Sequence, residues 1–356
     1  MSNDRNRRTY FISLLTLTIL AANIVDAQNR KLAQTGMKFL AVGASARQSA
    51  LADAFTAADG SSSSLFYNPA GMARLQSFAD ATFSTTEWIA EIKHQFGSIA
   101  ISPLNGEYGV IGISFQYVDY GEIQATILAN NTQGFLDVGT FKPTAYAVGI
   151  GYARALSDKF SVGGDVRWIK QDLGSGITEA TFTSTGGQAD GYSPVTTIDN
   201  TLGVYAFDFG IIYRTGFRSL NFGMTIRNFS REVKYQKESF QLPLTFKIGL
   251  SMNMLDLIEE DPNVHSLLVL ADAEHPRDYP EEIRLGMEYT FQQMLAVRLG
   301  YVYVGDEITR KEAEYSMSYG IGLRQSFAGT QFALDYSYTP FGVFDKVQRF
   351  SVQFGF

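Results

Sequence analysis

Cysteine is absent from the 356-residue sequence, which excludes a disulfide framework, a thiol nucleophile, a thiolate metal site and a lipoprotein anchor. No run of about 18 apolar residues occurs, so no helix is expected to span a bilayer. Charged residues amount to only 18%, and the net charge is −7. Nucleic-acid phosphates attract basic surfaces, so a nucleic-acid partner is not expected.

Glycine and aromatic residues are abundant instead, with 33 Gly, 19 Tyr and 27 Phe. From Ser77 onward, apolar residues recur at every second position, which is the period of a β-strand. The expected strands are about 9 to 13 residues long, close to the 9 to 11 that a tilted strand needs to cross a bilayer. An all-β fold is therefore predicted, namely a transmembrane antiparallel β-barrel of about 14 strands. The expected strands span 77–85, 92–102, 108–119, 144–155, 160–172, 202–215, 220–230, 242–253, 266–274, 282–291, 295–304, 315–325, 330–340 and 348–356.

The connections between these strands alternate in length. Short turns are expected at 156–159, 216–219, 292–294 and 326–329, and long loops at 120–143 and 173–201. Outer-membrane barrels keep short turns on the periplasmic side, so an even strand number predicts that both termini are periplasmic. The connection at 254–265 is longer than this rule allows, and its acidic stretch Glu259-Glu260-Asp261-Pro262 is expected to form a helical turn.

The last strand has an aromatic face that ends at the final residue. Such a strand is expected to be an assembly signal for the barrel-insertion machinery; the alternative is an ordinary edge strand, which would be an aggregation hazard in a soluble protein. The residues of this predicted signal are Phe350, Val352, Phe354 and Phe356.

The N-terminus has the order of regions found in a secretory signal peptide. Arginines within residues 5–8 precede an apolar run at 10–22, and Val25-Asp26-Ala27 offers small residues before Gln28. A buried N-terminal helix is the alternative. The predicted division of the chain is a signal peptide at 1–27, a plug segment at 28–76 and the barrel at 77–356.

The predicted plug lacks strand alternation. A helix is expected from Arg47 to Ala58, with Ser45 as its N-cap and apolar residues at helical spacing. A 14-stranded lumen is too wide for wall side chains to fill, so this segment is expected to enter it. The alternative is an amphipathic helix on the periplasmic rim. The apolar positions are Leu51, Ala54, Phe55 and Ala58.

Charged residues of the expected strands share the face opposite to the apolar one. A charge facing lipid near the midplane costs about 2 to 4 kcal/mol, so these residues are expected to face the lumen. Acids and bases nearly balance, which favours structural ion pairs over substrate recognition. The predicted lumen charges are Asp165, Arg167, Asp208, Arg227, Lys247, Asp272, Arg284, Glu288, Arg298, Arg324 and Asp335.

Several motifs of the plug resemble the N-terminal signature of the PorV/PorQ family, which is related to the fatty-acid transporter FadL. The resemblance implies that Asn68-Pro69-Ala70 fixes the plug to the barrel wall, and that Ala52 replaces a usual glycine. The resembling motifs are Gly43-Ala44-Ser45-Ala46-Arg47, Leu51-Ala52-Asp53-Ala54-Phe55, Asp59, and Phe66-Tyr67-Asn68-Pro69-Ala70-Gly71.

The resemblance implies transport of hydrophobic small molecules across the outer membrane. The alternative is a non-transporting component of type IX secretion that binds exported cargo proteins. No enzyme, cofactor or metal site is expected, because His94, His265 and His275 lack metal-ligand spacing or a serine partner that the sequence places nearby. The expected partners are outer-membrane lipid, the insertion machinery, and either a hydrophobic ligand or secreted cargo.

Overall fold

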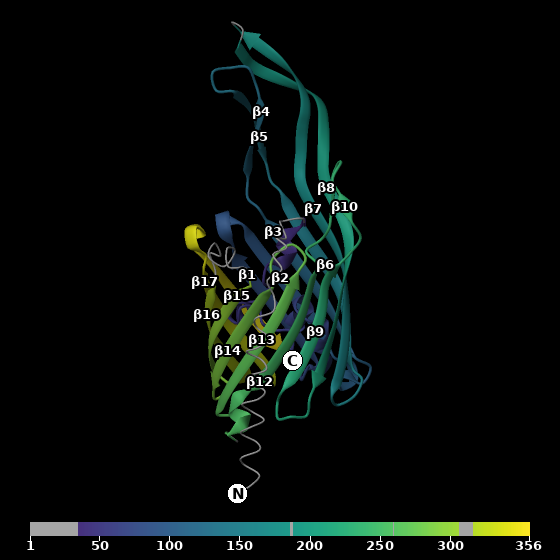
Figure 1. Ribbon diagram of the computed structural model, residues 1–356, viewed down its shortest axis with the longest axis vertical. Helices are drawn as coiled ribbons and strands as arrows, with labels where there is room; N and C mark the ends of the chain where they lie inside the picture. Colours follow the sequence, from purple (N-terminus) through teal and green to yellow (C-terminus); the bar gives the residue numbers. More distant parts are fainter. Residues whose placement is uncertain (1–34, 186–187, 259, 306–315) are drawn as a thin grey trace. The chain divides into compact units, whose positions relative to one another are not determined.

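A computed structural model describes residues 35–185, 188–258, 260–305 and 316–356. The expected signal peptide at 1–27 and its cleavage site lie outside these residues. Within them, fourteen antiparallel strands form one closed barrel in which the first strand pairs with the last (Figure 1). The predicted fold class is therefore confirmed.

The barrel strands follow one another around the wall in sequence order. They are β1 (Ala79–Glu87), β2 (Lys93–Ile101), β3 (Val110–Asp119), β6 (Thr144–Ala155), β7 (Phe160–Thr185), β8 (Gln188–Arg214), β9 (Asn221–Phe229), β12 (Thr245–Asn253), β13 (His265–Pro276), β14 (Glu282–Phe291), β15 (Leu295–Val304), β16 (Met317–Phe327), β17 (Thr330–Pro340) and β18 (Lys346–Gly355). Two small sheets lie in connections, β4 (Ile123–Leu128) with β5 (Phe135–Phe141), and β10 (Val233–Lys234) with β11 (Ser239–Phe240).

In the residues that the structure describes, helical structure is confined to short pieces. They are η1 (Lys38–Ala41), α2 (Ala46–Ala50), η2 (Ser62–Phe66), η3 (Pro69–Arg74), η4 (Ile89–Glu91), η5 (Pro103–Gly106), η6 (Met254–Leu257) and η7 (Gly342–Phe344). The helical turn predicted for the acidic stretch 259–262 is wrong for its described residues, because residues 260–262 are not helical and the helical turn of this connection, η6, ends at Leu257; Glu259 lies outside the described residues. Across the described parts of the chain, no helix combines the length and apolarity needed to cross a membrane.

The prediction of a loop at 173–201 was wrong. Strands β7 and β8 do not end at 172 and 202 but continue as one hairpin, whose register shifts after Asp172. Threonine is frequent there, and this β-branched residue favours strands even without apolar alternation. Figure 1 shows this hairpin projecting beyond the barrel, on the same side as β4 and β5.

The barrel is apolar outside and polar inside. In β15, Leu295, Val297 and Leu299 are 48, 55 and 45% exposed, whereas Arg298 between them is 1% exposed. A soluble protein has the opposite distribution, but a barrel surrounded by lipid must expose its apolar side chains and keep charge away from the hydrocarbon.

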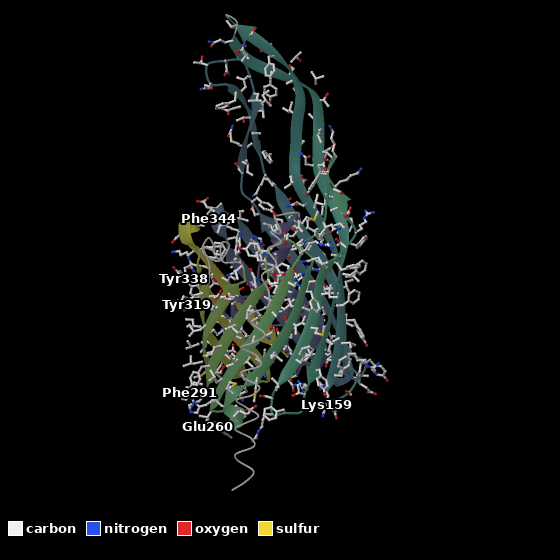
Figure 2. All side chains as sticks on the ribbon, in the orientation of Figure 1. Lys159, Glu260, Phe291, Tyr319, Tyr338 and Phe344 are labelled. Carbon is white, nitrogen blue, oxygen red and sulfur yellow. The ribbon has the colours of Figure 1, made fainter. Side chains whose placement is uncertain are left out.

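Aromatic side chains occur toward both ends of the strands. Tyr319 and Tyr338 are cross-strand partners nearer the end of the β7–β8 hairpin, and Phe291 lies nearer the opposite end, where Lys159 and Glu260 mark the turns (Figure 2). This distribution fits the aromatic girdles at the two membrane surfaces. We name the end with the turns at 156–159 and 292–294 the short-turn end, and the other the long-loop end.

Candidate functional site

Residues 35–76, which we name the lumen segment, precede β1 and contact the inner wall. The segment begins at the long-loop end, where Thr35 forms a parallel bridge with Gln241 and Lys38 pairs with Asp278. Its first turn, η1, then buries apolar side chains against the wall. This cluster contains Met37, Phe39, Leu40, Val118, Ala145, Ala147, Ile169, Val204, Ala206, Val233 and Leu242.

The prediction of one helix from Arg47 to Ala58 was wrong, because α2 ends at Ala50. Ala52 and Asp53 have φ of 56° and 57°, in the left-handed region that no helix continues through. This conformation also accounts for the glycine that the resemblance places at position 52, since glycine adopts it without steric cost. Ser45 occupies the N-cap position, but its side chain makes no capping bond.

The apolar side chains that suggested the longer helix are buried by tertiary contacts instead. They pack against aromatic residues of the lumen segment and the wall. The cluster contains Ala44, Leu51, Ala54, Phe55, Ala58, Phe66, Tyr67, Phe96 and Leu270. Helical spacing was therefore a poor guide here, since a compact series of turns buries the same positions.

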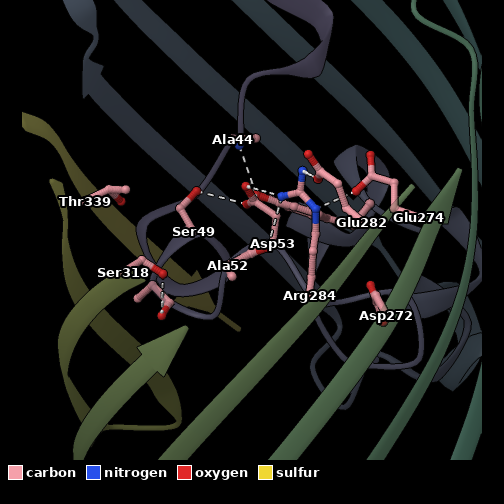
Figure 3. Close-up of polar contacts among 12 residues, drawn as sticks. Ala44, Ser49, Ala52, Asp53, Asp272, Glu274, Glu282, Arg284, Ser318 and Thr339 are labelled. Atoms are coloured by element: carbon pink, nitrogen blue, oxygen red, sulfur yellow. Dashed lines mark hydrogen bonds and ion pairs between the residues drawn. The ribbon is translucent and has the colours of Figure 1, made fainter. Parts of the chain in front are cut away.

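Tyr67 and Asp53 close the lumen segment on itself. The Tyr67 hydroxyl accepts a hydrogen bond from the Ala44 N–H and donates one to Asp53 Oδ1, both at 3.0 Å, and Ser49 also donates to Asp53 (Figure 3). Burial, together with the Asp53 carboxylate, raises the pKa of Tyr67 well above its usual range. The phenol therefore stays protonated and remains a donor.

Asn68-Pro69-Ala70 attaches the segment to the wall. Asn68 Oδ1 accepts from the Ala70 N–H at 3.1 Å and caps η3, while Nδ2 donates to the carbonyl oxygens of Thr56 at 2.7 Å and Ile211 at 3.1 Å. Pro69 occupies the first helical position, where its missing N–H costs nothing. One asparagine thus joins two parts of the lumen segment to β8.

Inward-facing glycines let the segment approach the wall backbone. A Cβ at Gly163 would lie 2.5 Å from Ala70 N, and one at Gly286 would lie 2.9 Å from Leu51 Cβ. Glycines on other strands lie equally close to atoms of the lumen segment. We name this set the glycine wall; its members are Gly163, Gly210, Gly223, Gly286, Gly300 and Gly320. Because these glycines have no side chain, the backbone of the segment approaches the wall more closely than any other residue would allow.

The first and last strands are linked to each other through the segment. Ser351 Oγ of β18 accepts from the Ala46 N–H at 2.7 Å and donates to Ser84 of β1 at 2.9 Å. Asp80 of β1 accepts from the Ser62 N–H at 2.7 Å and from Gln353 of β18 at 2.6 Å. The barrel seam is therefore bridged from inside.

The eleven predicted lumen charges all lie on the inward face of their strands. One cluster surrounds Asp208, which pairs with Arg167 at 2.7 Å and Arg227 at 3.6 Å, while Asp165 lies 3.3 Å from Arg167. Asp272 stands apart and accepts from Thr56 Oγ1 at 2.6 Å. These contacts are structural pairs within the wall or onto the lumen segment.

A second cluster joins β14 to β17. Glu288 binds Arg47 at 2.7 Å, Arg298 at 2.5 Å and Arg324 at 3.7 Å, and Arg298 also binds Asp335 at 2.7 Å. Burial alone would lower the pKa of Arg47, but the Glu288 carboxylate more than offsets this, and the pKa is raised. The lumen segment is thus anchored by charge on this side of the barrel.

The third cluster includes acids that the sequence analysis missed. Glu274 binds Lys247 at 2.8 Å and Arg284 at 2.6 Å, and Glu282 binds Arg284 at 2.6 Å (Figure 3). Both acids are at strand ends, where alternation alone does not show which way a side chain points. Arg349 was missed too, although it shares the inward parity of its strand.

The lumen contains a polar cavity of about 30 Å³ between residues 40–43 and the wall, near Arg227, Lys247 and Glu274. This is room for little more than one water molecule. Within the described ranges, no three His, Cys, Asp or Glu side chains are grouped to hold a metal ion.

The aromatic face of the last strand points outward. Phe350 is 54% and Phe356 57% exposed, and β18 pairs with β17 on one side and β1 on the other. In the closed barrel this strand is therefore not an edge. Its role as an assembly signal remains a prediction.

Solved outer-membrane proteins have the same fold at low sequence identity. The CymD monoaromatic hydrocarbon channel has a TM-score of 0.54 at 12% identity, covering 88% of this chain and 96% of that chain. The Ralstonia pickettii toluene transporter TbuX has a TM-score of 0.54 at 12% identity, covering 88% and 97%. A Pseudomonas aeruginosa FadL homologue has 0.53 at 12%, covering 87% and 97%.

No curated protein sequence matches the chain. The family described as type IX secretion system protein PorV matches residues 25–269. This match covers more than half of the sequence, and it includes the lumen segment with its Asn68-Pro69-Ala70 turn. The chain, an outer-membrane β-barrel, therefore belongs to the PorV family.

Proposed function

We propose that this protein is a non-transporting component of type IX secretion that binds exported cargo proteins at the cell surface. The observation that carries this proposal is the packing of the lumen segment. Its backbone is seated on the glycine wall, and its ion pairs and seam contacts reach strands all around the barrel. A lumen filled in this way serves as a rigid support rather than a conduit.

The proposed cargo-binding surface is the hairpin extension, which we define as residues 120–143 and 173–201. The two parts support each other, because the Ala189 N–H donates to the Asn130 carbonyl at 2.8 Å and Thr132 donates to Gln188 at 3.0 Å. Apolar side chains on it are exposed, such as Leu128 at 88% and Val195 at 58%. With the short turns in the periplasm, the extension faces the outside of the cell.

The proposal is tested by shortening the extension. Asp172 and Thr201 are cross-strand partners, so replacing residues 173–200 with Asn-Gly joins them through a two-residue hairpin. We expect the variant barrel to assemble normally and to lose binding to cargo that carries a C-terminal sorting domain. The matched control is Val343→Ser with Phe344→Ser, which alters exposed residues of another connection at the same end. Normal cargo binding by the shortened variant would contradict the proposal.

The second candidate function is passage of hydrophobic small molecules, which the fold of the hydrocarbon channels favours. Planar-bilayer conductance tests whether the lumen segment closes the barrel, and uptake of a hydrophobic molecule separates the two functions. We expect the intact chain to be closed, removal of residues 28–76 to open the pore, and Asn68→Ala with Pro69→Ala to give a milder leak. Equal conductance of all three would mean that the lumen segment does not close the barrel. Uptake of toluene into liposomes by the intact barrel would favour transport.

A further inference from the structure

Four polar side chains lie next to one another on the inner wall near the long-loop end. They occupy consecutive strands in register, because Thr86 of β1 is the partner of His94 on β2 and of Arg349 on β18, and Ser337 of β17 is also a partner of Arg349. Thr86 and Ser337 are fully buried, and His94 and Arg349 are 2% and 4% exposed. We name this set the Arg349 row.

Each member of the Arg349 row has a buried polar atom without a hydrogen-bond partner among the described residues. These atoms are Thr86 Oγ1, His94 Nδ1, Ser337 Oγ and Arg349 Nε. Buried polar groups are nearly always paired, so four orphaned atoms in one row call for an explanation.

Arg349 differs from the charged residues of the three clusters. Nowhere in the described ranges does a carboxylate come within ion-pair distance of it, and its one hydrogen bond, from Nη1 to Thr339 Oγ1, is long at 3.5 Å. The Asp53 carboxylate interacts with Arg349 only electrostatically, without an ion-pair contact. The Arg349 guanidinium lies 5.5 Å from the centre of the Trp88 ring. A buried cation without a counter-ion is costly, which points to an anion from outside the chain.

The chemistry of the four atoms defines that anion. A guanidinium N–H and two hydroxyls donate, and an imidazole nitrogen donates in one of its tautomers, whereas the row contains no carboxylate to repel negative charge. A guanidinium with a hydroxyl on the neighbouring strand at either side suits a group with more than one oxygen. Aromatic rings lie beside the row on one side. The ring centres of Trp88 and His94 are 6.0 Å apart, and the His94 ring stacks on Phe96.

We propose that the Arg349 row binds an oxyanionic group, a carboxylate or phosphate, carried either by a small free anion or by a lipid headgroup. The site lies beside the lumen segment and not on the hairpin extension. The proposal is therefore independent of cargo binding, and either can fail without the other.

Trp88 provides the readout, because the protein has only two tryptophans and Trp168→Phe leaves Trp88 as the only one. The detergent-solubilised full-length protein is titrated with inorganic phosphate, benzoate and dihexanoyl phosphatidic acid while Trp88 fluorescence is recorded. Benzyl alcohol is the uncharged match for benzoate. We expect saturable binding of at least one oxyanion and none of benzyl alcohol. Binding of phosphate identifies a free anion, and binding of phosphatidic acid alone identifies a headgroup.

Arg349→Gln should weaken oxyanion binding by about 10- to 100-fold, the usual effect of losing a charged hydrogen bond. The matched control is Arg324→Gln, which removes a lumen arginine outside the row and should leave binding unchanged. Ser337→Ala removes one hydroxyl that holds no other contact, so it should weaken binding several-fold without affecting folding. Unchanged binding in both Arg349→Gln and Ser337→Ala, or no binding of any oxyanion to the unaltered row, would overturn the proposal.

Discussion

Adding one methyl group at Gly163 should loosen the lumen segment. Its Cβ would lie 2.5 Å from Ala70 N and from the Pro69 carbonyl carbon, so the turn must move by about 1 Å to reach an ordinary contact. Overpacking of this kind costs about 1 to 3 kcal/mol. The same movement stretches the hydrogen bond from Asn68 to Thr56, worth about 1 kcal/mol. We therefore expect Gly163→Ala to lower the free energy of unfolding by about 2 to 4 kcal/mol.

Gly164 provides the control, because it is the next residue of the same strand and faces outward. A Cβ there would be 3.5 Å from its nearest neighbours, which is ordinary contact, so Gly164→Ala should be within about 0.5 kcal/mol of the parent or slightly stabilising. The assay is urea unfolding of the barrel in lipid vesicles, together with protease sensitivity of residues 35–76. Equal unfolding free energies for the two variants would refute the argument that the glycine wall seats the segment.

Three further changes have defined outcomes. Phe356→Asp should leave export intact but abolish outer-membrane assembly, and a heat-modifiable band at normal yield would contradict this. Glu288→Ala should lower the unfolding free energy by about 3 to 5 kcal/mol, because it leaves Arg47 and Arg298 without their shared carboxylate; a loss below 1 kcal/mol would show that the cluster is dispensable. Ser351→Ala should cost about 1 to 3 kcal/mol, since the Ala46 N–H loses its acceptor, and urea unfolding indistinguishable from the parent would argue against the seam contact.

Much of the barrel could be predicted because lipid imposes a strict period of two on every strand that crosses it. Strands β6, β14, β15 and β17 occupy the residues expected for them. The extension of β7 and β8 was missed because strands surrounded by water on both faces need no apolar alternation. The sequence of their hairpin therefore resembles that of a polar loop.

The lumen segment was harder to predict, because tertiary contacts determine its conformation. Nothing local reveals that Ala52 and Asp53 adopt left-handed angles, which serve to bring Asp53 to Tyr67. Arg349 carried a usable signal, since it shares the inward parity of Ser351. That its charge has no partner could be known only from the neighbouring strands.

The seam contacts constrain the order in which this protein can be built. The lumen segment leaves the ribosome before any strand, yet its N–H groups bind both β1 and β18, which are furthest apart in the sequence. The segment thus contacts both strands of the seam from inside the barrel. We therefore expect the segment to be in place when the last strand meets the first, so that a part of the chain made early waits for the final residues.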